Sequence, residues 1–253
     1  IDMAEILNLN LYQFLMVFLR VGSALMLMPG FSSSYVNTQV RLSAALALSV
    51  VLMPVIASHL PPAPSDFAVL LQYILYEITI GVFLAVIMQT IYASLNLAGN
   101  LAGQAIGFSN AQNFDPAFQT QSIVVETFLS ITALTVIFLT DLHHTMLSAV
   151  IDSYYLFPVG EALPLGDFSN QLSQTVNNSF IIGFKLGAPF IAFSIVFYVG
   201  MGLVSRLMPQ LNIFFLSLPL QIYLGLGLLF ITTPMIIMWF TQYFADGLYL
   251  YQH

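Results

Sequence analysis

The residues with the clearest potential for chemistry lie in Asp141-Leu142-His143-His144, where a carboxylate precedes two imidazoles. Asp and His can bind a metal ion, but consecutive histidines on a helix point about 100° apart. No His-Glu-x-x-His motif accompanies them, and the chain has 0 cysteines, which excludes disulfides and thiolate ligands. We therefore expect a hydrogen-bonded cluster at a helix end, and neither a metal site nor a cofactor.

Nucleophilic catalysis by a serine and a histidine is the second chemistry to consider. Ser109 follows Gly107 and Phe108, and His143 or His144 would serve as its base if hydroxyl and ring came within hydrogen-bond distance. Such a dyad also needs an oxyanion hole, and a lone Gly-x-Ser is common in unrelated proteins. No glycine-rich phosphate loop with Lys and Ser or Thr is present, which argues against an ATPase. We expect no catalytic residue, and an intramembrane protease is the third alternative.

Charged residues within or beside apolar runs form the next group. A charge inside a membrane is costly and normally has a partner of opposite sign. Arg20 with Glu77 is one pair that the sequence suggests, and Lys185 with Glu126 or Asp141 is another. The favoured role is a salt bridge between hairpins or subunits. The alternative is a secondary transporter or ion channel that uses Arg20, Glu77 and Lys185.

A glycine ladder precedes a polar segment. Gly99, Gly103 and Gly107 recur at every fourth position, which leaves one face of a helix bare and permits close helix packing and a hinge. Residues 109–121 then read SNAQNFDPAFQTQ, polar with interleaved aromatics and too long for a tight turn. Polar, non-helical chain at membrane depth is tolerated only inside protein or beside a water-filled cavity. The residues alone leave a loop that enters a pore and an ordinary cytoplasmic loop equally open.

The composition defines the elements that must position these residues. Of the 253 residues, 59% are hydrophobic and only 6% are charged, against about 25% charged in soluble proteins. The chain is therefore an integral membrane protein. Its 4 basic and 11 acidic residues give a formal charge of −7, which offers no electrostatic basis for nucleic-acid binding.

Six long apolar runs indicate membrane helices, because they do not alternate as barrel strands do and each reaches the ~17–25 residues that span a bilayer. Several are longer, and prolines lie in or beside them, so we expect kinked and tilted hairpins that assemble with partners. Arg41 and Arg206 flank two of the breaks, which the positive-inside rule places in the cytoplasm. The runs cover residues 7–28, 40–57, 67–97, 122–157, 176–206 and 211–250.

Several motifs, in order along nearly the whole chain, resemble the FliR family, the R subunit of the flagellar type III export gate, whose injectisome counterpart is the T subunit. Residues 98–116 read AGNLAGQAIGFSNAQNFDP, with the glycine ladder, Gly-Phe and Asp-Pro of the family. The segment before Asp115-Pro116 is more polar than is usual in that family. Further matching stretches are Phe18-Leu19-Arg20, Met28-Pro29-Gly30-Phe31, Arg41, Glu77-Ile78-Thr79-Ile80-Gly81, Asp141-Leu142-His143-His144, Phe157-Pro158-Val159-Gly160, and a hairpin turn with Arg206, Pro209, Gln210, Asn212, Phe214 and Pro219.

The resemblance implies an all-α pore complex. It implies a P-subunit-like part over residues 1–170, a Q-subunit-like hairpin over residues 171–253, and a join in the linker 158–174. It further implies a plug in the pore and, at the flagellar basal body in the bacterial inner membrane, contacts with lipid, exported unfolded polypeptides, the P and Q subunits and the B subunit. The positions that match the plug are Gly107, Phe108, Ser109, Asn110, Asn113, Phe114, Asp115, Pro116 and Phe118.

Overall fold

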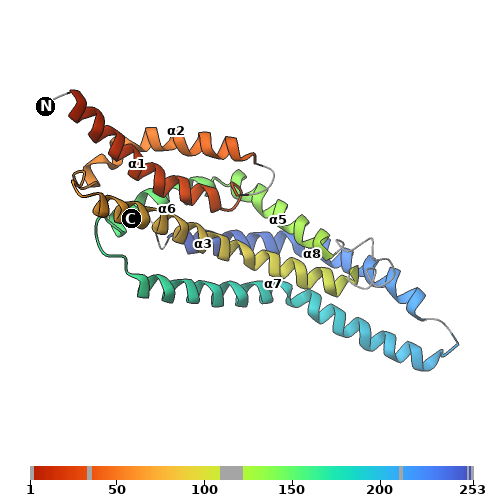
Figure 1. Cartoon of the computed structure of the whole chain (residues 1–253). Coiled ribbons are helices and arrows are strands. Elements are labelled where there is room, and N and C mark those ends of the chain that lie inside the picture. Colours follow the sequence, from red (N-terminus) through yellow and green to blue (C-terminus); the bar gives the residue numbers. More distant parts are fainter. Residues whose placement is uncertain (1–2, 33–35, 109–121, 211–212, 250, 252–253) are drawn as a thin grey trace. The chain divides into compact units, whose positions relative to one another are not determined.

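The computed structural model describes residues 3–32, 36–108, 122–210, 213–249 and 251, and Figure 1 shows its helices with their labels. The described part of the chain is helical and contains no strand. The helices are α1 (Met3–Leu27), α2 (Thr38–Ile56), a 3₁₀ turn (Ala57–His59), α3 (Phe67–Ile106), α5 (Ser122–Leu139), α6 (Leu142–Leu156), α7 (Leu165–Leu207) and α8 (Ile213–Tyr249). The expected all-α membrane fold is therefore confirmed.

Among the described residues, four helices are long and apolar enough to cross a membrane, within Thr38–His59, Phe67–Ile106, Leu165–Leu207 and Ser217–Tyr249. A fifth span is possible by length and composition if α5 and α6 act as one broken helix. The helix over Leu11–Leu27 is apolar but shorter. Because many large apolar side chains on these helices are exposed, lipid or other proteins must cover them.

Two expectations about the runs need correction. The fourth run is not one helix, because the chain breaks between α5 and α6 at Asp141, whose φ of 58° lies in the left-handed region. No proline is needed for this break, since one left-handed residue ends the helical path. The linker expected over 158–174 is also shorter, because α7 already begins at Leu165.

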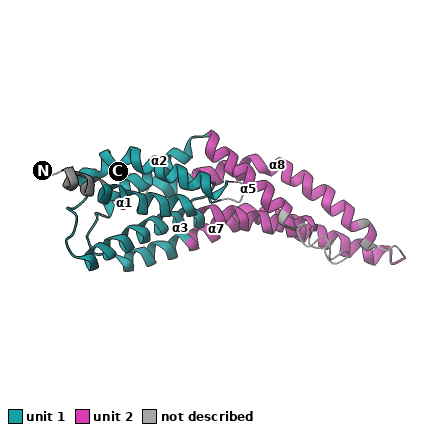
Figure 2. Ribbon diagram, turned by 45° about the horizontal axis from the view of Figure 1, so that its top comes forward, with its two compact units in different colours: residues 1–90, 140–175, 244–253 teal, residues 91–139, 176–243 magenta. Residues whose placement is uncertain are grey.

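The chain forms two compact units (Figure 2). Unit 1 contains residues 1–90, 140–175 and 244–253, and unit 2 contains residues 91–139 and 176–243. Helices α3, α7 and α8 each contribute one part to either unit. These units do not follow the division at residue 170 that the family resemblance implies, so that division stays a prediction.

Unit 1 surrounds the first part of α3. Helices α1 and α2 pack together as a hairpin, and Met16, Val17, Ala24 and Leu25 of α1 are fully or almost fully buried. An aromatic cluster closes the other side, because the ring of Phe83 stacks on Phe168 at 4.0 Å and meets Tyr251 edge-on at 6.5 Å. This packing places the polar residues of α1, α3 and α6 in a site closed to solvent.

Unit 2 surrounds the last part of α3. Tyr92 donates a hydrogen bond to the Ser130 carbonyl of α5 at 2.9 Å, and Ser130 donates to the Asn96 side chain at 2.7 Å. On α7, Ser179 and the Tyr243 hydroxyl of α8 lie 3.1 Å apart. Hydrogen bonds between neighbouring helices thus supplement apolar packing, as expected where no water competes for the polar groups.

Candidate functional site

The centre of unit 1 is a buried ion pair between Arg20 of α1 and Glu77 of α3. Arg20 Nε donates to Glu77 Oε2 at 2.8 Å, and Arg20 Nη2 donates to Glu77 Oε1 at 2.7 Å. Both side chains are 0% exposed. The contact is bidentate, the geometry in which a guanidinium binds a carboxylate most strongly.

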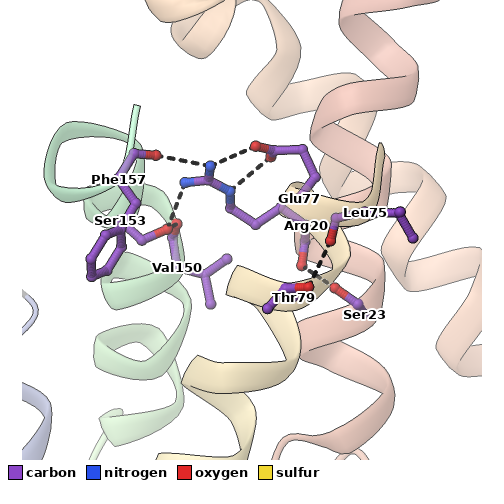
Figure 3. Close-up of polar contacts among 8 residues, drawn as sticks. All are labelled: Arg20, Ser23, Leu75, Glu77, Thr79, Val150, Ser153 and Phe157. Carbon is purple, nitrogen blue, oxygen red and sulfur yellow. Dashed lines mark hydrogen bonds and ion pairs between the residues drawn. The ribbon is translucent and has the colours of Figure 1, made fainter. Parts of the chain in front are cut away.

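The remaining donors of Arg20 hold the end of α6 (Figure 3). Nη1 donates to the Ser153 hydroxyl at 3.2 Å, and Nη2 also donates to the Phe157 carbonyl, just past the helix, at 3.0 Å. The guanidinium carbon lies 3.8 Å from the centre of the Tyr154 ring, a cation–π contact. One arginine therefore joins α1, α3 and α6.

A glycine explains how α1 comes close enough. Gly81 follows Glu77 by one helical turn and lies on the same face of α3. A Cβ atom there would collide with the Ser23 hydroxyl and with the Arg20 carbonyl of α1. The Glu-x-x-x-Gly motif thus supplies both the carboxylate and the close approach that the ion pair requires.

This geometry favours a structural role for the pair. Arg20 and Glu77 are fully buried and bound to each other, whereas a transport relay needs charged groups that exchange partners along a path. Breaking such a pair by removing one partner leaves a buried charge uncompensated. Of the two pairings that the sequence suggested, this one is confirmed.

The other charged candidates have different surroundings. Among the described residues of unit 2, neither Lys185 nor Glu126 takes part in an ion pair, so the pairing of Lys185 with Glu126 or Asp141 stays a prediction. Lys185 is exposed and Glu126 half-buried. Arg41 donates to the Val36 carbonyl at 3.0 Å and thereby supports the start of α2. Arg206 is exposed in the last turn of α7.

The Asp-Leu-His-His cluster lies at the start of α6. His144 Nδ1 is 3.6 Å from Asp141 Oδ1, and the rings of His143 and His144 are 4.1 Å apart. The donor atoms of all three residues lie within 4.8 Å of one another. The side chains therefore converge more than two adjacent histidines on a helix are expected to, and the absence of a metal site stays a prediction. Both Asp141 and His144 are largely exposed.

The glycine ladder serves two purposes instead of one. A Cβ atom on Gly99 would lie 2.6 Å from the Cα of Glu126, so this glycine lets α5 pack directly on α3. Gly103 is also buried. Gly107, however, follows the last residue of α3 and has φ +97°, a conformation that glycine adopts readily and other residues rarely do. It ends the helix and does not extend the bare stripe.

Gln221 of α8 is a residue that the sequence analysis missed. It is 2% exposed, and its Nε2 donates to the Ala105 carbonyl of α3 at 2.8 Å and to the Tyr198 hydroxyl of α7 at 3.3 Å. Gly225 lies one turn further along the same face of α8, where a Cβ atom would come within 2.8 Å of Ile106. Gln221 and Gly225 repeat the polar-x-x-x-Gly pattern of Glu77 and Gly81. This pattern is the sequence signal by which Gln221 could have been found.

Close contacts at glycine also join α7 to α3. A Cβ atom on Gly183 would lie 2.6 Å from the Ser94 carbonyl, and one on Gly187 would lie 2.8 Å from the Leu101 side chain. Together with Gly99 and Gly225, these residues surround the last part of α3 with three helices at close distance.

Most of the predicted loop lies outside the described residues. Gly107 is buried and Phe108 half-buried, whereas Ser109, Asn110, Asn113, Phe114, Asp115, Pro116 and Phe118 are not described. In the predicted hairpin turn, Pro209 and Gln210 are exposed and Pro219 is exposed within α8. Asn212 and the side chain of Phe214 also fall outside the description.

Comparison with known proteins gives a match along almost the entire chain. Residues 11–247 match the model of "Bacterial export proteins, family 1". The chain is 36% identical over 237 residues to the flagellar biosynthetic protein FliR of Caulobacter vibrioides, covering 94% of each chain. The chain belongs to the FliR family of bacterial export proteins. The FliR protein of Bacillus subtilis is 28% identical over 89% of this chain and 87% of its own.

The chain is also similar to a more distant protein, the Yop proteins translocation protein T of Yersinia pestis. It is 24% identical over 86% of this chain and 84% of its own. The matched range contains the ion pair of α1 and α3, the glycine ladder and the Gln221 contact. The sites described above therefore lie within the part of the chain that is common to the FliR family.

Proposed function

We propose that this protein is a structural and gating subunit of the flagellar type III protein-export channel and passes unfolded flagellar proteins across the inner membrane. The observation that carries the proposal is the match to flagellar FliR proteins along 94% of the chain. The translocation protein of the injectisome is less similar, which supports a flagellar assignment. The role is non-enzymatic and needs no cofactor.

The gate itself is assigned to the segment after the glycine ladder. A loop from Gly107 to Phe118 with three phenylalanines can occlude a narrow pore and move aside for a polypeptide, because loops open at low free-energy cost. The close packing of α3 at Gly99 supports this assignment, since a rigid helix gives the loop a fixed origin. Together with Gly99, the glycines Gly103 and Gly107 are the positions proposed to allow close helix packing and a hinge.

The partners follow from the same proposal. Residues 1–170 take the place of a P-type subunit and residues 171–253 that of a Q-type hairpin, beside the P, Q and B subunits. The uncovered apolar side chains of α7 and α8, such as Val196 and Phe230 at 72% and 84% exposure, support such contacts. The proposed location is the inner membrane at the flagellar basal body.

Native mass spectrometry of the tagged chain, purified from its own host in mild detergent, tests the assembly. We expect a large complex that contains several other small membrane subunits. A stable monomer or a small homo-oligomer would contradict the proposal and favour a transporter.

The gating role is tested by deleting Ser109–Gln119 and measuring ion leakage through the closed gate. The deletion should raise the leak while the complex remains assembled. An unchanged leak in an intact complex would count against the plug.

A further inference from the structure

The last turn of α3 ends inside unit 2, where its backbone needs partners. The final four carbonyl groups of a helix have no partner within that helix. Where no water reaches such a group inside a membrane protein, a carbonyl left without a partner is costly. Gly107 N–H donates to the Gln104 carbonyl at 3.1 Å, and the Gln221 amide satisfies the Ala105 carbonyl.

The fit around this contact is tight on both sides. A Cβ atom on Gly107 would lie 3.0 Å from the Cδ of Gln221, so no larger residue fits at the turn without displacing the amide. One turn further along α8, a Cβ atom on Gly225 would lie 3.1 Å from the Cβ of Ile106. Gln221 and Gly225 therefore hold residues 105–107 by hydrogen bonding and by close contact.

We infer that Gln221 is a positioning residue of the export gate, because it fixes the point and direction at which the chain leaves α3. Through it, the C-terminal hairpin controls the origin of the segment that starts after Phe108. Tyr198 of α7 shares the same amide, so both helices of the hairpin take part. This inference rests on the proposed gating function and adds to it the contact that sets where the gating segment begins.

The test compares two glutamines of α8 in the assembled complex. Gln221→Met keeps the side-chain volume and removes the donor, and Gln242→Met makes the same change at an exposed position of the same helix. We expect Gln221→Met to raise the ion leak of the closed gate about tenfold, the ratio that corresponds to about 1.4 kcal/mol. Native mass spectrometry should show an intact complex, and Gln242→Met should leave the leak unchanged. An intact Gln221→Met complex without a higher leak would overturn the inference.

A disulfide tests the same contact independently of folding defects. The chain has 0 cysteines, and the Cβ separation between positions 106 and 225 is 3.1 Å. A disulfide needs about 3.5–4.5 Å between its Cβ atoms, so a small outward shift of α8 lets the bond form. Ile106→Cys with Gly225→Cys, placed in the Gln221→Met chain, should restore a low leak when the disulfide is oxidised, and the leak should return on reduction. A disulfide that forms without lowering the leak refutes the positioning role.

The deletion of Ser109–Gln119 separates the two proposals. If the deletion leaks and Gln221→Met does not, the gating function stands and the role of Gln221 fails. If neither variant raises the ion leak, the proposed plug role of the deleted segment is wrong.

Discussion

At the scale of single residues, Arg20 of α1 connects its own helix to α3 and to α6. It binds Glu77 through two nitrogens and also contacts Ser153, Tyr154 and Phe157. A lysine offers a single ammonium group and cannot reproduce this planar fork. The arginine therefore determines where α1, α3 and α6 meet.

Removing one partner of this pair should destabilise unit 1 strongly. Arg20→Met leaves the Glu77 carboxylate buried without its cation, and we expect a loss of about 3–5 kcal/mol. The measurement is the fraction of assembled complex that survives heating in mild detergent. Arg20→Met combined with Glu77→Leu, which removes both charges, serves as the control and should recover much of the loss. Equal damage in the single and the double variant would show that packing and not charge is responsible.

Tyr251 should make stability depend on alkaline pH. Burial raises its pKa to about 12, above the ordinary value of about 10. The fold therefore favours the neutral phenol, and the resulting stability is complete below pH 10 and is lost as the pH rises towards 12. Melting temperatures measured at several pH values should fall less steeply over this range for Tyr251→Phe than for the wild type.

Neutral pH supplies the control for this prediction. The Tyr251 hydroxyl is buried and makes no hydrogen bond in the described part of the chain. Its removal should therefore leave the melting temperature at pH 7 unchanged or slightly higher. Identical slopes for the two chains above pH 10 would show that other groups cause the alkaline loss.

At the scale of helices, glycine decides which faces meet. Gly81 admits α1, Gly99 admits α5, and Gly183 admits the backbone of α3 to α7. A buried polar residue lies one turn before two of these glycines: Glu77 before Gly81 and Ser179 before Gly183. Small residues with interhelical hydrogen bonds are the usual basis of helix association in membranes.

An alanine at one of these contacts should separate two helices. Gly183→Ala places a methyl group 2.6 Å from the Ser94 carbonyl, and overpacking of this kind costs about 1–3 kcal/mol. Gly202→Ala on the same helix is the matched control, because no atom lies within 4 Å of its Cβ position. Thermal stability of the assembled complex should fall for the first variant and stay level or rise slightly for the second. A comparable loss in both variants would mean that helix propensity and not packing is responsible.

The sequence predicted the helices and the central ion pair well, for identifiable reasons. A long apolar run predicts a membrane helix directly. Arg20 and Glu77 were recognised because charged residues are rare in such runs. The break at Asp141 was missed because the apolar pattern continues across it, and a single left-handed residue leaves no trace in hydropathy. Gln221 was missed because an uncharged amide in an apolar run attracts little notice, although the glycine four residues later marks its position.

At the scale of the whole molecule, one face of α7 is exposed and needs a partner protein to cover it. Gly183, Gly187 and Phe190 are buried on one side of the helix, and the residues on the opposite side are exposed. Lipid alone is a poor environment for this exposed face, because it includes a lysine. The exposed residues of this face are Ile181, Lys185, Val196, Val199 and Leu203.

We expect a partner subunit to cover this face in the complex. Val199→Cys introduces a single reactive thiol into a chain with 0 cysteines. Labelling of this chain by a maleimide, measured by mass spectrometry, should be slow in the complex and fast in the isolated chain in detergent. Labelling in denaturant sets the full extent. Equal rates in the complex and the isolated chain would show that the face stays open.

The length of α7 has a consequence for the cell's supply of this protein. Its 43 residues extend about 65 Å, roughly twice the hydrocarbon thickness of a bilayer. A newly made chain without its partners therefore has no membrane depth that covers it well, and quality-control proteases should remove it. Its half-life should be short when it is synthesised alone and long when the other subunits are made with it. The number of gates per cell is then limited by matched synthesis of all subunits, and surplus copies do not accumulate.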